Sequence, residues 1–194
     1  MAEVKVLVEG YARKEGNNLF ASPTTTLIKD NGKLILVDPG ANEKKLLASL
    51  KDEGLKPEDI DIVFLTHYHI DHLLNIRLFP GKAIYDGDTI YEDDKESFYE
   101  EKIPGTNIGV IPTPGHAHEH CALEVKTDKG IVVIAADVFW WRDEEKQKTD
   151  RENLLNHKDP YTKNEKDLLE SRKKLLEVAD YIIPGHGKMF KVKR

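Results

Sequence analysis

The chain has 194 residues, of which 39% are hydrophobic and 33% are charged, and its 29 Lys and Arg against 35 Asp and Glu give a net charge of −6. This balance fits one slightly acidic globular domain spanning residues 1–194. No apolar run approaches the roughly 20 residues that cross a bilayer, which excludes a membrane-spanning helix. The scattered charges argue against a broad nucleic-acid-binding face.

The N-terminal residues lack the apolar core of a secretory signal, so a cytoplasmic location is expected. Lys and Glu are abundant and Gln147 is the only glutamine, a usage that leans toward a thermophilic source. The single cysteine, Cys121, cannot form an internal disulfide and is expected to be a small buried apolar side chain.

The first half of the chain predicts strands interrupted by helices. Apolar runs predict strands over 4–8, 24–28, 33–37 and 60–65, and Asn31-Gly32 predicts a two-residue turn. Leucines at helical spacing predict a helix over 43–53 that ends at Gly54. A short helix is expected over 72–79, with Asp71 as its cap.

The second half predicts more strands than helices. Short β-branched runs predict strands over 82–85, 89–91, 108–111, 121–126, 131–135 and 181–183. Helices are predicted over 144–156 and 163–179. Since each half has several strands and at least one helix, the fold class is α/β (α+β), with a two-sheet sandwich and helices on its outer faces.

Most of the eight histidines are clustered rather than dispersed. The segment Thr66-His67-Tyr68-His69-Ile70-Asp71-His72 follows a predicted buried strand, and an extended turn would point His67 and His69 to the same side. Imidazole nitrogens and carboxylate oxygens both bind metal ions. The loop therefore offers four ligands, more than one ion could take from so short a segment, and two ions are implied.

Three further polar residues follow predicted strands. His116 comes after the Pro114-Gly115 turn, Asp137 after the strand over 131–135, and His186 within a second Pro-Gly-His turn. Strand ends of one sandwich can share a rim, so we expect these side chains to join the histidine loop.

The ordered set His-x-His-x-Asp-His, His, Asp and His resembles the metallo-β-lactamase superfamily over nearly the whole chain. The resemblance implies a four-layer αββα sandwich with two mixed β-sheets. It also implies that Asp38, in Leu36-Val37-Asp38-Pro39-Gly40, braces the metal loop without binding metal. The ligands it implies are His67, His69 and His116 for a first metal, Asp71, His72 and His186 for a second, and Asp137 as a bridge between them.

Within the superfamily, several segments are similar to the small metallo-β-lactamase domain-containing protein 1 group: Ala136-Asp137-Val138-Phe139, Ser171-Arg172-Lys173-Lys174 and Pro184-Gly185-His186-Gly187. True β-lactamases of this fold usually place a cysteine among the second-metal ligands, whereas here Asp137 fills that slot. Antibiotic hydrolysis is therefore disfavoured.

The implied activity is metal-dependent hydrolysis of an ester, thioester, lactone or phosphodiester bond. Two Zn²⁺ per chain are expected, and Fe or Mn would also suit these donors. Such ions, roughly 3.5 to 4 Å apart, would share a hydroxide whose parent water has a pKa of about 7. Asp71 could accept a hydrogen bond from this hydroxide. The net positive charge of this centre favours an anionic small-molecule or phosphodiester substrate.

Two other functions stay open. One is a nuclease acting on RNA or DNA, which the similarity to the domain-containing protein 1 group favours and the lack of an obvious basic strip opposes. The other is a mononuclear iron dioxygenase acting on persulfides, because some relatives with the same histidine motif hold iron. The number of metal ions per chain distinguishes such a dioxygenase from a dinuclear hydrolase. A homodimer is open as well, and no membrane partner is expected.

Other polar and aromatic residues have less specific expectations. His118 is a candidate catalytic residue, because an extended loop would place it on the side of His116. His120 and His157 are expected to be exposed and to play no part in the site. Trp140 and Trp141 are expected to pack beneath a helix, with a substrate wall as the alternative. Residues 171–174 are expected to form a solvated helix face, with phosphate binding as the alternative.

Overall fold

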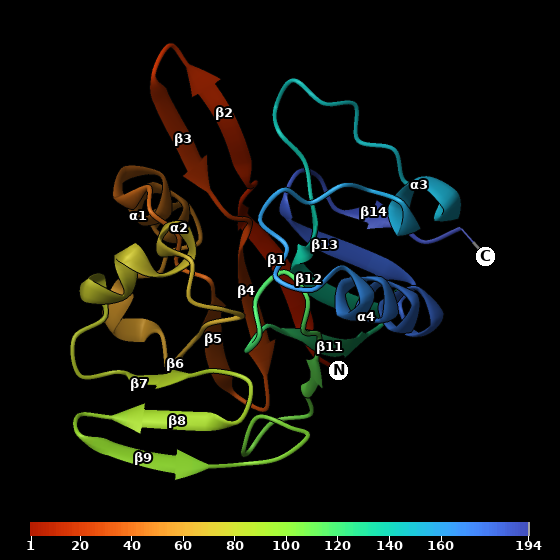
Figure 1. Ribbon diagram of the computed structural model, residues 1–194. Coiled ribbons are helices and arrows are strands. Elements are labelled where there is room, and N and C mark those ends of the chain that lie inside the picture. The colour runs from red at the N-terminus through yellow and green to blue at the C-terminus, as the bar shows by residue number, and fades with distance from the viewer. Residues whose placement is uncertain (194) are drawn as a thin grey trace.

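Two β-sheets packed face to face form the centre of the molecule, shown by a computed structural model that describes residues 1–193 (Figure 1). The first sheet has the order β1-β4-β5-β6-β7-β8-β9. Its strands are β1 (Glu3–Val8), β4 (Thr25–Asp30), β5 (Lys33–Val37), β6 (Ile62–Phe64), β7 (Ala83–Tyr85), β8 (Thr89–Glu92) and β9 (Lys95–Phe98). The pairs β5-β6 and β6-β7 are parallel and the others antiparallel, so this sheet is mixed.

The second sheet has the order β10-β11-β12-β13-β14. Its strands are β10 (Gly109–Pro112), β11 (Cys121–Thr127), β12 (Gly130–Trp140), β13 (Tyr181–His186) and β14 (Phe190–Lys191). Only β12 and β13 pair in parallel, which makes this sheet mixed as well.

Helices cover the outer face of each sheet. They are α1 (Glu43–Asp52), α2 (Ile70–Leu73), α3 (Arg151–Leu155) and α4 (Glu165–Val178), with 3-10 helices at Pro57–Asp59 and Leu74–Leu78. Leu46 and Leu50 of α1 pack on the first sheet, and Leu168 and Leu175 of α4 pack on the second. Between the sheets lies a third apolar layer that includes Phe64. The four-layer αββα sandwich is therefore confirmed.

A β-hairpin that the sequence did not predict projects from the sandwich at the top of Figure 1. Its strands β2 (Tyr11–Glu15) and β3 (Asn18–Ser22) pair only with each other. Their sequence shows little alternation of apolar and polar residues, because most of their side chains are exposed or half-buried. Strands β9 and β14 were missed for related reasons: β9 is mostly exposed and β14 has only two residues.

The helix predicted over 144–156 is wrong for its first half. Only α3 is helical there, beginning after Asp150, whose side chain accepts from Asn153 N at 3.1 Å. Residues 144–150 contain no apolar side chain that a helix could bury. Hydrogen bonds of Gln147 hold the segment instead: its side-chain oxygen accepts from Lys188 N and its side-chain nitrogen donates to Lys188 O.

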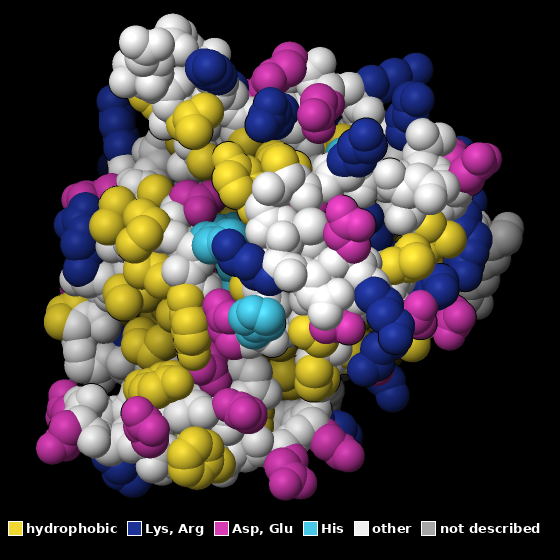
Figure 2. Space-filling view, viewed as in Figure 1, with side chains coloured by type: hydrophobic (Ala, Val, Ile, Leu, Met, Phe, Trp, Pro, Cys, Tyr) yellow, Lys and Arg dark blue, Asp and Glu magenta, His cyan; other side chains and the backbone are white. Residues whose placement is uncertain are grey.

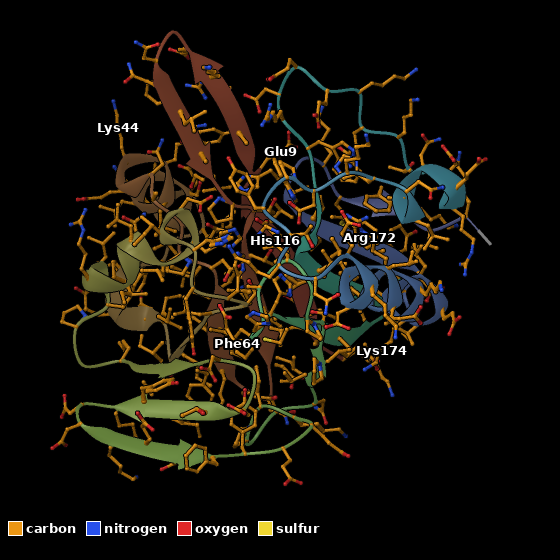
Figure 3. The ribbon with its side chains drawn as sticks, viewed as in Figure 1. Glu9, Lys44, Phe64, His116, Arg172 and Lys174 are labelled. Carbon is orange, nitrogen blue, oxygen red and sulfur yellow. The ribbon has the colours of Figure 1, made fainter. Side chains whose placement is uncertain are left out.

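Two smaller expectations also need correction. Asp71 does not cap a helix over 72–79, because α2 begins at Ile70 and the next turn is a 3-10 helix. Residues 171–174 are not a wholly solvated face: Arg172 is buried, bonding Val138 O and His157 O, while Lys174 is exposed (Figure 3). No helix within residues 1–193 is long and apolar enough to cross a membrane.

Candidate metal centre

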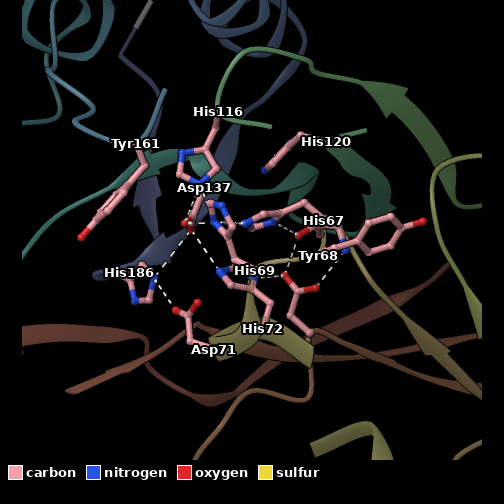
Figure 4. Close-up of polar contacts among 12 residues, drawn as sticks. His67, Tyr68, His69, Asp71, His72, His116, His120, Asp137, Tyr161 and His186 are labelled. Atoms are coloured by element: carbon pink, nitrogen blue, oxygen red, sulfur yellow. Dashed lines mark hydrogen bonds and ion pairs between the residues drawn. The ribbon is translucent and has the colours of Figure 1, made fainter. Parts of the chain in front are cut away.

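Seven side chains meet where strands of both sheets end (Figure 4). The histidine loop follows β6 of the first sheet, while the other three residues belong to the second. His116 follows β10, and His186 is the last residue of β13. Asp137 lies within β12 rather than after it, but regular pairing with β13 is interrupted between Ala136 and Trp140, and Ala136 has a φ of 42°. This bulge turns Asp137 toward the cluster.

The first group of donors surrounds one point. His69 Nδ1 lies 3.1 Å from His67 Nε2 and 2.9 Å from His116 Nε2. Asp137 Oδ2 lies 3.3 Å from His116 Nε2 and 3.9 Å from His67 Nε2. Donors about 2.0 to 2.1 Å from a tetrahedral zinc ion are separated by about 3.3 Å. The spacing of this group therefore fits such an ion.

The second group uses the other oxygen of the same carboxylate. Asp137 Oδ1 lies 3.3 Å from His72 Nε2 and 3.8 Å from His186 Nε2. Asp71 Oδ2 lies 3.3 Å from His186 Nε2. These distances between donor atoms also fit the coordination of one metal ion.

Two atoms at the centre are buried without a hydrogen-bond partner among residues 1–193, namely His72 Nε2 and Asp137 Oδ1. Buried polar atoms are rarely left unpaired, because desolvation without a partner costs about 1 to 3 kcal/mol. A cation between them would satisfy both atoms. The cluster, made only of nitrogen and oxygen donors, therefore fits the divalent metal ions that the sequence implies.

Asp38 fixes the ring orientation of two of these histidines. Its Oδ2 accepts from His72 Nδ1 at 2.8 Å and from Thr66 Oγ1 at 2.8 Å, and its Oδ1 accepts from Thr66 N at 2.9 Å. Because the Thr66 hydroxyl proton goes to Asp38, Thr66 Oγ1 accepts from His67 Nδ1 at 3.0 Å. The Nε2 lone pairs of His67 and His72 are thus free for metal.

The remaining outer nitrogens also face acceptors. His116 Nδ1 donates to Asp159 Oδ2 at 2.6 Å, and the Asp159 side chain is completely buried. His186 Nδ1 lies 3.0 Å from Tyr11 O and 3.1 Å from Ser22 O, at the base of the hairpin. Sequence reasoning missed Asp159, which lies 43 residues from its partner and carries no motif.

The protonation states at the centre suit a cation. Burial opposes the charged form of Asp137, but His72 and His186 hold the pKa of its carboxyl well below the usual value. Burial, and then His72, lower the pKa of His67. Burial alone would lower the pKa of His72, yet Asp137 and Asp38 raise it well above its usual value. In the metal-free chain these two carboxylates therefore favour a proton on the His72 ring, and a metal ion would take the place of that proton at Nε2.

The structure does not bring every predicted histidine to the cluster. His118 is exposed, and within residues 1–193 no hydrogen bond or ion pair joins it to the seven side chains. His120 is buried rather than exposed, bonds Thr113 Oγ1 at 2.8 Å, and lies with its ring centroid 4.8 Å from that of His67. His157 is half-buried and bonds Trp140 O at 2.7 Å, so its predicted exposure is wrong.

A cavity of about 800 Å³ opens directly onto the cluster, and His69, Asp71, Asp137 and His186 form part of its lining. Figure 2 shows histidine side chains reaching the surface in the middle of this face, beside hydrophobic and Lys or Arg side chains. Trp140 lines this cavity with its ring centroid 6.0 Å from that of His186. Trp141 instead packs in the core beneath α3 and α4.

The family model described as the metallo-beta-lactamase superfamily matches residues 20–109. Metallo-beta-lactamase domain-containing protein 1 of Xenopus laevis is 33% identical, covering 97% of this chain and 81% of its own length. A Methanocaldococcus jannaschii protein named as a probable metallo-hydrolase is 31% identical, and the match covers 98% of this chain and 90% of its own length.

A solved structure has the same fold as this chain. A Thermotoga maritima protein described as a putative metallo-beta-lactamase superposes with a TM-score of 0.74 at 18% identity, covering 98% of this chain and 99% of that one. The two relatives above 30% identity, each matched over most of its length, show that the chain belongs to the metallo-β-lactamase superfamily, as a metal-dependent hydrolase.

Proposed function

We propose that this protein is a hydrolase with a dinuclear metal centre, loaded with zinc, that cleaves an ester, thioester, lactone or phosphodiester bond. The observation that carries the proposal is the Asp137 carboxylate. Its Oδ2 lies 3.3 Å from His116 Nε2 in one group, and its Oδ1 lies 3.3 Å from His72 Nε2 in the other. A carboxylate in this position can bridge two ions, and the two-ion arrangement is a common centre for hydrolysis.

The residues that would hold the first ion are His67, His69 and His116, and those for the second are Asp71, His72 and His186. When bound, ions at these donors supply Lewis acidity, which lowers the pKa of a water molecule and stabilises negative charge on the substrate. Zinc suits this donor set, and iron or manganese would also be accepted by it.

The chain's own residues orient the reactants. The Asp71 side chain is 26% exposed and lines the cavity, so its carboxylate can accept a hydrogen bond from the attacking water. The rings of Trp140 and Tyr161 lie 5.7 Å apart and also line the cavity, where they can exclude bulk water and position the substrate. Asp38 and Asp159 hold the histidine rings in place.

The test is the metal content of the purified chain, measured by elemental analysis, together with hydrolysis of a panel of chromogenic esters, thioesters, lactones and phosphodiesters. We expect two zinc ions per chain and activity on at least one bond type. Asp137→Ala should lose both ions and reduce activity by at least about a hundredfold. Asp128→Ala removes an exposed carboxylate in the β11-β12 turn and should change neither quantity.

Two outcomes would contradict the proposal. One is a single iron per chain combined with oxygen consumption on persulfides, which would indicate the dioxygenase alternative. The other is a fully metal-loaded protein that hydrolyses no member of the panel. Circular dichroism of Asp137→Ala shows whether the variant is folded, so that loss of metal is separated from loss of structure.

A further inference from the structure

The cavity beside the metal centre has an apolar wall that the hydrolytic chemistry does not require. Nine large hydrophobic side chains are well exposed within residues 1–193, and four of them line this one cavity: Leu19, Phe20, Ile70 and Tyr161. Leu19 is 70% exposed and Ile70 is 66% exposed. Because exposed apolar side chains that surround one concave site indicate contact with a ligand, the wall is suited to an apolar group.

This wall is fixed relative to the metal centre. Leu19 and Phe20 belong to the β2-β3 hairpin, whose base is joined by the pairing of Tyr11 with Ser22. The carbonyls of those two residues face His186 Nδ1 at 3.0 and 3.1 Å. The hairpin that carries Leu19 and Phe20 is therefore anchored at its base beside His186.

Cationic side chains also belong to the lining of the same cavity. Arg13, Lys14 and Arg142 line it, against one acidic side chain outside the metal cluster, Glu144. Arg13 is paired with Glu15 at 2.7 Å and lies over the Phe20 ring. In the part of the chain that the structure describes, the side chains of Lys14 and Arg142 have no hydrogen-bond or ion-pair partner.

Outside the metal cluster, the side chains that line this cavity therefore carry more positive than negative charge, although the chain as a whole has a net charge of −6. Such a local excess of positive charge attracts and orients an anionic ligand. We infer that the substrate or product of this site is a small anionic amphiphile, with its apolar part against Leu19, Phe20 and Ile70 and its negative group near Lys14 and Arg142. This inference rests on the proposed hydrolase function, since it names the substrate class of that site.

The test measures binding rather than turnover. The metal-loaded protein is titrated with 1-anilinonaphthalene-8-sulfonate, a fluorescent apolar anion, and the probe is displaced by alkanesulfonates of four to ten carbons. We expect affinity to rise about fourfold with each added methylene group until the apolar wall is covered. Decanol, which has a similar chain and no charge, should displace the probe less well than decanesulfonate.

Variants assign the two halves of the ligand. Lys14→Gln and Arg142→Gln should each weaken decanesulfonate about two- to fivefold at low salt and leave decanol unchanged. Leu19→Asn should flatten the dependence on chain length. Lys129→Gln removes an exposed lysine from the β11-β12 turn, outside the cavity, and should bind all competitors as the unmodified chain does.

Affinity that is independent of both chain length and the two cations would overturn the inference. So would stronger displacement by a ten-nucleotide single-stranded DNA than by any alkanesulfonate, since that indicates a polyanion. The proposed function is tested separately. A protein that binds alkanesulfonates but hydrolyses no substrate of the panel would support the amphiphile-binding site and contradict the hydrolase function. An active hydrolase that binds no alkanesulfonate would support the proposed function and contradict only the inference that the substrate is an anionic amphiphile.

Discussion

Each histidine whose Nε2 faces the shared aspartate has an acceptor at its other ring nitrogen. His67 uses the Thr66 hydroxyl, His72 uses Asp38, His116 uses Asp159 and His186 uses backbone carbonyls. An acceptor at Nδ1 keeps the proton there and leaves the Nε2 lone pair directed at the cluster. His69 is the exception, because its Nδ1 itself faces the other donors.

Asp159 should therefore contribute to metal affinity although it touches no other donor of the cluster. Asp159→Asn removes the negative charge next to His116 Nδ1 while keeping the shape of the side chain. We expect metal to bind about 10- to 100-fold more weakly. The measurement is competition with a chromophoric chelator, with Asp128→Asn as the matched exposed variant. Unchanged metal affinity in Asp159→Asn would show that the carboxylate only supports the loop between α3 and α4.

The residues that carry a motif could be predicted from the sequence, and Asp159 could not. The histidine loop follows a buried strand, so the position of four polar side chains at one sheet end can be read directly from the chain. Asp159 lies in a polar loop and reaches His116 only because α4 packs against the second sheet. Such a contact depends on packing between distant segments, which a single sequence does not show.

At the scale of elements, α4 presses against the turn that presents His116. Gly115 has a φ of 135°, and a Cβ placed there would lie 2.3 Å from Leu168 N. The Gly115 carbonyl also accepts from Lys163 N at 2.7 Å and from Asn164 N at 3.0 Å, at the start of the helix. The position of His116 therefore depends on how closely α4 approaches the turn.

Gly115→Ala should lower both stability and metal affinity, because a methyl group forces the helix and the turn apart. Gly54→Ala is the matched variant: Gly54 has a φ of 71° and nothing within 4 Å of the added Cβ. Its backbone strain alone should cost about 1 to 2 kcal/mol. Urea unfolding of the metal-free proteins should show a larger loss for Gly115→Ala. Equal losses would mean that the packing of α4 on the turn is not tight.

Elements with a buried face were predictable, and those without one were not. The prediction for α1 is confirmed to within one residue, because Leu46 and Leu50 repeat at helical spacing and pack on the first sheet. The exposed β2-β3 hairpin shows no such repeat, and residues 144–150 have helix-forming residues but nothing to bury. Because the hairpin lines the cavity, the part of the site that we propose to contact the substrate was the part least visible in the sequence.

At the scale of the whole molecule, the metal donors join the two sheets. The first sheet contributes the loop after β6, and the second contributes His116, Asp137 and His186. The apolar layer between the sheets holds them together elsewhere. Ions bound at this rim would therefore add a second connection between the halves of the sandwich.

Metal binding should consequently raise the thermal stability of the entire fold. A ligand present at about 100 times its dissociation constant adds about 2.7 kcal/mol, which corresponds to a rise in Tm of about 5 to 10 °C for a chain of this size. Calorimetry with and without zinc measures the rise. Asp137→Ala should abolish most of it, since Asp137 faces both donor groups, while Asp128→Ala should retain it. If zinc left the Tm of the unmodified chain unchanged, these donors would not form a zinc site that is specific to the folded state.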